Sequence, residues 1–142
     1  MKHIYHTLIL LFLALITEAQ NGRTNEKHSI DIRLEKCLAR SSNQTTYGMI
    51  NCEDLASAEW DKELNKYYQL LMEVLPTEEK NKLRSAQLAW VSYKEKEKDF
   101  SATMHYNMQG TMWKVVSAGR NTDITRQRTL ELISYYNTYS GE

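Results

Sequence analysis

The sequence predicts an all-α protein: a small antiparallel helical bundle with one disulfide, following a cleaved signal peptide. Three observations predict this fold. The 142 residues contain a single proline, Pro76. Three long segments repeat apolar residues three or four positions apart, as one face of a helix requires. No segment has an evident partner strand, so helices packed side by side in a single domain are expected.

The first residues, 1–19, are predicted to be a signal peptide. Lys2 gives a weakly basic start, an apolar stretch runs over residues 8–16, and Thr17-Glu18-Ala19 places small residues before a cut at Gln20. The apolar stretch is shorter than the about 20 residues that span a membrane, and an uncleaved anchor is the alternative. No cysteine lies near the cut to accept a lipid. A periplasmic or secreted chain with no membrane span after cleavage is therefore expected.

The mature chain begins with a polar stretch over residues 20–28, which predicts a flexible leader before a single domain over 29–142. Residues 29–39 fit a helix or a strand, because their apolar residues satisfy both helical spacing and alternation. A short helix capped by Ser29 is favoured, since no partner strand is evident. Residues 40–48 are rich in Ser, Thr, Asn and Gln, which predicts a loop.

Two long helices are predicted on either side of Pro76. The first covers residues 49–74, which contain no Gly or Pro and carry an apolar stripe: Cys52, Ala56, Trp60, Leu64, Tyr67, Leu71 and Val74. The second begins at Thr77, a capping residue followed by two acids that suit the helix dipole, and runs to about Met104.

The last part of the chain is predicted to be helical after a turn at Gly110. Thr111 is a candidate cap, Gly119 and Asn121 are expected to interrupt or end the helix that follows, and residues 123–139 are helical again.

The balance of charges argues against a nucleic-acid partner. The chain has 18 Lys and Arg against 18 Asp and Glu, and the signal peptide removes one of each sign. A nucleic-acid partner would require a basic surface, so a protein partner is expected instead.

The two cysteines, Cys37 and Cys52, are expected to form a disulfide in an oxidising compartment. Two free thiols or two metal ligands are the alternatives.

No catalytic, metal or cofactor site is predicted. His28 and His105 belong to no metal-binding motif, and His105 is expected at the surface. Adjacent acids, Glu53-Asp54 and Glu78-Glu79, point about 100° apart on a helix and cannot flank one glycosidic bond. The protein is therefore not expected to be an enzyme.

Three strings of residues occur in a recognisable order: Asp61-Lys62-Glu63-Leu64-Asn65-Lys66-Tyr67-Tyr68, then residues 83–94 (LRSAQLAWVSYK), then Thr125-Arg126-Gln127-Arg128. Together they resemble the LprI-type lysozyme inhibitor family of small exported bacterial proteins, from about residue 37 to residue 132. The positions that fill the family pattern are Asp61, Leu64, Asn65, Tyr68, Gln87, Trp90, Tyr93, Thr125 and Arg128. A second family disulfide is absent, because Lys98 and Arg120 stand at the matching positions.

The resemblance implies a helical scaffold that binds a protein, with a lysozyme or a similar glycan-cleaving enzyme as the expected target. The alternative is a structural or adaptor protein of the envelope that binds another envelope protein through a helical face. A function as a peptidoglycan-cleaving enzyme is not favoured, because the sequence offers no suitable pair of catalytic acids.

Two sets of residues are candidates for the site. The family positions are predicted to be structural, with Asn65 or Gln87 bridging helices and Arg128 pairing with Asp61. The loop closed by the disulfide is the candidate binding loop, because a disulfide at its base lowers the entropy lost on binding. Its candidate contact residues are Ser42, Asn43, Thr45, Thr46 and Tyr47. A plain polar connection is the alternative for this loop.

Overall fold

The computed structural model describes residues 27–141. The predicted signal peptide and most of the predicted leader lie outside the described residues. The elements are α2 (Ser29–Leu38), the short 3-10 helix η1 (Ser41–Asn43), α3 (Thr46–Val74), α4 (Thr77–Tyr106) and α5 (Met112–Ser140). No strand occurs within 27–141. The prediction of an all-α fold is confirmed, as is the choice of a helix for residues 29–39.

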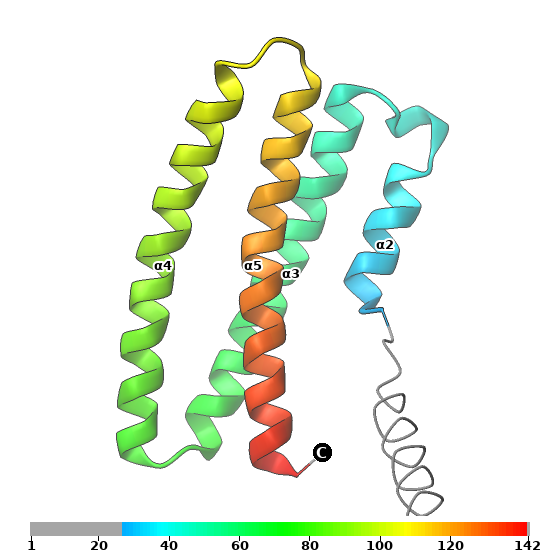
Figure 1. Cartoon of the computed structure of the whole chain (residues 1–142). Coiled ribbons are helices and arrows are strands. Elements are labelled where there is room, and N and C mark those ends of the chain that lie inside the picture. The colour runs from blue at the N-terminus through cyan, green and yellow to red at the C-terminus, as the bar shows by residue number, and fades with distance from the viewer. Residues whose placement is uncertain (1–26, 142) are drawn as a thin grey trace, which may run out of the picture.

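Successive helices run up and down the bundle, so each is antiparallel to the next (Figure 1). The most extensive packing nevertheless joins α3 to α5, which run in the same direction. α2 packs on α3, and α4 packs on α5. The central pair is therefore α3 and α5, with α2 and α4 attached to them.

The core consists of two clusters along α3. Ile30, Ala56 and Trp60 form the first, and Leu64, Leu71 and Leu132 form the second. Trp60 and Leu132 have no exposed surface. Apolar residues at helical spacing thus account for the contact of α3 with both α2 and α5.

α4 contributes only Ser101 and His105 to the fully buried residues. The expectation that His105 lies at the surface is wrong, because its exposure is 8%. It occupies the last turn of α4, where its ring stacks on Trp113 of α5 with 5.7 Å between centroids. The facing helix, which the sequence pattern did not specify, buries it.

Several helix boundaries differ from the predicted ones. α2 is capped by His28, whose Nδ1 accepts from the N–H of Ile30 at 3.3 Å, and not by Ser29. α3 begins at Thr46, three residues earlier than predicted, because the Thr45 side chain accepts from the N–H of Gly48 at 3.0 Å. Neither Thr77 nor Thr111 makes a capping bond with its side chain.

The largest correction concerns α5, which continues without a break through Gly119 and Asn121. A glycine costs a helix only about 1 kcal/mol, and packing along α3 outweighs this. A Cβ added to Gly119 would lie 3.6 Å from Oε1 of Glu53 on α3, an ordinary van der Waals distance, so this contact does not itself require glycine.

Candidate binding surfaces

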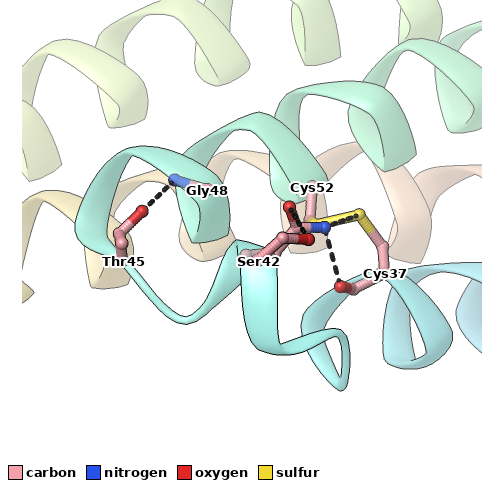
Figure 2. Close-up of a disulfide and its surroundings, with 6 residues drawn as sticks. Cys37, Ser42, Thr45, Gly48 and Cys52 are labelled. Carbon is pink, nitrogen blue, oxygen red and sulfur yellow. Dashed lines mark hydrogen bonds between the residues drawn. A yellow bond between two sulfur atoms is a disulfide. The ribbon is translucent and has the colours of Figure 1, made fainter.

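The disulfide joins the end of α2 to α3 and closes the loop between them (Figure 2). Cys37 and Cys52 are bonded, with their Cα atoms 5.8 Å apart, as predicted. Asn43 supports this closure, because its Nδ2 donates to the carbonyl oxygen of Cys37 at 3.0 Å and lies 3.4 Å from both sulfur atoms. The base of the loop is therefore held by one covalent and several polar contacts.

The backbone of this loop folds into short helical structure. Residues Ser41–Asn43 form η1, and Thr45 caps α3 (Figure 2). A Cβ added to Gly48 would lie only 2.6 Å from the Cα of Asn43, so the close approach of η1 to α3 requires glycine there. Asn43 and Thr45, two of the candidate contact residues, are thus engaged in holding the loop.

The remaining candidates reach the surface at one end of the bundle. Ser42 is exposed, and Tyr47 is 83% exposed on the first turn of α3. Thr46 shares a 3.0 Å hydrogen bond between hydroxyl groups with Thr111 in the α4–α5 turn. This bond sets the loop beside that turn (Figure 1). Tyr106, the last residue of α4, is 82% exposed.

The family positions gather elsewhere, around a groove of about 280 Å³ between α3 and α4. The α3 side carries Asp61, Leu64, Asn65 and Tyr68, and the α4 side carries Gln87 and Trp90. Leu88 and Val91 of α4 also line the groove and are 68% and 43% exposed. The groove thus combines six family positions with open apolar surface, and we call it the α3–α4 groove.

Of the pairings predicted for the α3–α4 groove, Gln87 bridges two helices, whereas Asn65 does not and Asp61 does not pair with Arg128. Nδ2 of Asn65 donates to the backbone carbonyl of Asp61 at 2.8 Å, so Asn65 bonds within its own helix. Oδ1 of Asp61 lies 3.4 Å from Nζ of Lys94, not beside Arg128. The same Nζ lies 5.1 Å from the ring centroid of Trp90, a cation–π contact.

Arg128 instead bonds to Gln87 and Glu131. Its Nε donates to Oε1 of Gln87 at 3.0 Å, and its NH1 donates to Glu131 at 2.9 Å. Gln87 therefore joins α4 to α5, and Arg128 pairs with Glu131 while Asp61 pairs with Lys94. A smaller cavity here is lined by Trp90, Tyr93 and Arg128 among others.

The last family positions differ in burial. Leu64 and Thr125 are 5% and 2% exposed and lie in the interior, whereas Tyr93 is 49% exposed. The carbonyl of Thr125 accepts from the hydroxyl of Thr129 at 2.8 Å.

One partly buried ion pair has no counterpart among the predicted residues. Arg126 donates through Nε and NH2 to the two carboxylate oxygens of Asp31, at 2.9 and 2.8 Å, and so ties α2 to α5. The hydrogen bond to Asp31 is the main cause that raises the pKa of Arg126. Its guanidinium also lies 5.8 Å from the ring centroid of Trp60. No spacing rule connects residues so far apart in the sequence.

Glu53 has a perturbed carboxyl group. Burial is the main cause that raises its pKa, nearby Asp123 and Asp54 raise it further, and a hydrogen bond with Thr122 opposes them.

Across the described part of the chain, no three His, Cys, Asp or Glu side chains gather as a metal site requires. Within residues 27–141, no helix combines the length and the hydropathy of a membrane-spanning segment.

Comparison with known protein families identifies the family of this chain. The model of a family described as "Lysozyme inhibitor LprI" matches residues 37–132, from the disulfide to the buried Leu132. The chain belongs to the LprI family. A comparison with curated proteins found no match.

A crystal structure of an uncharacterised protein from Burkholderia thailandensis is similar to this LprI-family chain. The TM-score is 0.77, the sequence identity is 27%, and the similarity covers 82% of this chain. It covers 58% of the Burkholderia chain. The helical arrangement is thus shared with a larger protein.

Proposed function

We propose that this protein is an exported envelope protein that binds and inhibits a lysozyme-type glycan hydrolase, and that it is not itself an enzyme. The observation that carries the proposal is its membership of the LprI lysozyme inhibitor family over residues 37–132. An inhibitor of this kind needs a rigid scaffold and a projecting contact surface, with no chemistry of its own. The ordered loop beside the disulfide supports this requirement.

We assign the contact with the hydrolase to the loop of residues 40–48, with Tyr47 as its anchor. The Thr45 cap and the disulfide restrain the backbone beside Tyr47, whose side chain is 83% exposed. A stiff aromatic side chain on a restrained backbone loses little entropy on binding. Ser42 and Tyr106 extend this surface with a hydroxyl group and a second aromatic ring.

A second candidate function, an adaptor that binds another envelope protein, is supported by the α3–α4 groove. Leu88 is 68% exposed there, beside Trp90, Lys94 and Asp61. An apolar groove with charged groups at its rim suits a helix or an extended segment of a protein partner.

The two functions are separated by titrating the purified mature chain against a panel of lysozymes. Inhibition below micromolar concentration is expected for at least one of them, and Tyr47→Ala should weaken it at least tenfold. The matched control is Tyr139→Ala, which removes a 49% exposed tyrosine at the opposite end of the bundle. Both variants should keep the helical circular dichroism of the parent.

A groove variant decides where the contact lies. If Leu88→Ser abolishes inhibition while Tyr47→Ala does not, the partner binds the α3–α4 groove and the loop assignment is wrong. If no lysozyme is inhibited, the inhibitor function is not retained and the result favours the adaptor function. Export is tested separately by sequencing the N-terminus of the protein recovered from the native host, which should begin at Gln20.

A further inference from the structure

The turn between α4 and α5 concentrates sulfur ligands that the proposed function does not use. Met104, Met108 and Met112 recur every four residues across this turn, with His105 beside the first and Trp113 beside the last. The three methionines are 39%, 39% and 58% exposed, so packing in the core does not account for them. Thioether sulfur is a soft ligand that favours Cu(I) over hard cations.

His105 has the environment of a metal-binding histidine. It is more than nine-tenths buried, and its Nδ1 lies 3.2 Å from the hydroxyl of Ser101. Among the described residues, no group forms a hydrogen bond with Nε2. When Nδ1–H donates to Ser101, the tautomer is fixed and Nε2 keeps a free lone pair for a metal ion.

Helix geometry places Met104 and Met112 on one flank of the hairpin, with Met108 in the turn between them. α4 and α5 run antiparallel (Figure 1). The ring of His105 stacks on that of Trp113 across their contact. In an antiparallel pair, the residues that directly precede two facing positions fall on the same flank. Met104 and Met112 are these residues. Met108 lies just beyond the end of α4, where its N–H donates to the carbonyl of His105 at 3.2 Å.

The charge of the turn agrees with a soft, singly charged ion. Residues 100–122 contain no Asp or Glu, so the turn offers none of the carboxylate ligands that Mg²⁺ and Ca²⁺ prefer. Its cationic side chains are Lys114 and Arg120, and Arg120 pairs with Glu97 at 3.1 Å.

From these observations we propose that Met104, His105, Met108 and Met112 form a Cu(I)-binding site. The ligands are three thioethers and the Nε2 atom of one imidazole, all uncharged. The Trp113 ring lies beside the site and can stabilise the ion by a cation–π contact. Binding involves no change of oxidation state and does not depend on the inhibitor function.

The test uses the full mature chain with its disulfide intact, which alkylation should verify by finding no free thiol. Anaerobic competition with bicinchoninate should show one Cu(I) bound per chain. Ag(I), a redox-inert probe, should quench the fluorescence of Trp113, and Trp113→Phe should remove the quenching while the stoichiometry stays at one.

Matched variants test the ligands without disturbing the fold. Met108→Leu with Met112→Leu conserves side-chain volume and should weaken Cu(I) binding at least tenfold. Met72→Leu in α3 is the control and should bind as the parent does. The proposal is overturned if the parent fails to compete with bicinchoninate, or if Met104, Met108 and Met112 can all be replaced by Leu without loss of affinity. Equal affinity for Zn(II) would also contradict a soft thioether site.

Discussion

α3 and α4 have nearly the same length but very different surroundings. α3 buries six of its 29 residues, including Trp60, Leu64 and Leu71, whereas α4 buries two of 30. On α4, Leu88 and Phe100 remain 68% and 60% exposed. α4 is held to its neighbours partly by polar contacts such as Gln87–Arg128 and Glu97–Arg120. Long helical periodicity therefore predicts a helix well but says little about how firmly that helix is packed.

The largest expected difference between the two regions comes from a pair of leucine truncations. Leu132→Ala on α5 removes a side chain with no exposed surface that packs in the cluster along α3, and should cost about 2–5 kcal/mol. Leu88→Ala on α4 should change the stability by about 0.5 kcal/mol or less, because Leu88 is largely exposed. Urea unfolding of both variants measures this difference, and equal losses would remove the distinction between α4 and the central pair.

Removing the disulfide should have the next largest effect. Cys37→Ala with Cys52→Ala opens a loop of about 16 residues and should lower the free energy of unfolding by about 3 kcal/mol. The loss should appear in urea unfolding. Hydrogen exchange should show faster opening of α2, with little change in α4, which the disulfide does not contact. Faster exchange throughout α4 would mean that the two regions do not open independently.

A smaller loss is expected from Arg128→Ala. This substitution leaves the amide of Gln87 without its partner between α4 and α5, and should cost about 1–3 kcal/mol. Arg84→Ala is the matched control, because Arg84 bonds to Asn81 within α4. Thermal unfolding and hydrogen exchange of α4 measure the effect. If Arg128→Ala leaves stability unchanged but abolishes binding of a partner, the residue serves recognition instead of packing.

The smallest effect is expected at Glu53, within the packed region. Its pKa is raised in the folded state, so ionisation disfavours folding. Stability should fall as the pH rises from below the ordinary value of 4.5 through the raised value. Glu53→Gln should therefore be neutral at pH 3.5 and stabilising by about 0.5 kcal/mol or less at pH 7. Urea unfolding at both pH values tests this, and a destabilised variant at pH 7 would show that the carboxylate has a favourable contact.

The candidate site was predictable only in part. The loop between Cys37 and Cys52 follows from composition and from the presence of two cysteines. That Asn43 and Thr45 hold this loop, leaving Ser42 and Tyr47 at the surface, depends on the close approach of η1 to Gly48. The family positions were recognisable as a string of residues. Which of them line the α3–α4 groove and which, like Arg128, pack between α4 and α5 depends on which faces of the helices meet.

The sequence by itself determined the helical class, the break at Pro76, the single disulfide and the family. These follow from local periodicity, backbone chemistry and residue identity. Only the tertiary structure decided that α5 continues through Gly119, that His105 is buried against Trp113, and that Asp31 pairs with Arg126. Each of these depends on contacts between helices distant in the sequence, and an apolar stripe shows which face of a helix is buried without showing which helix covers it.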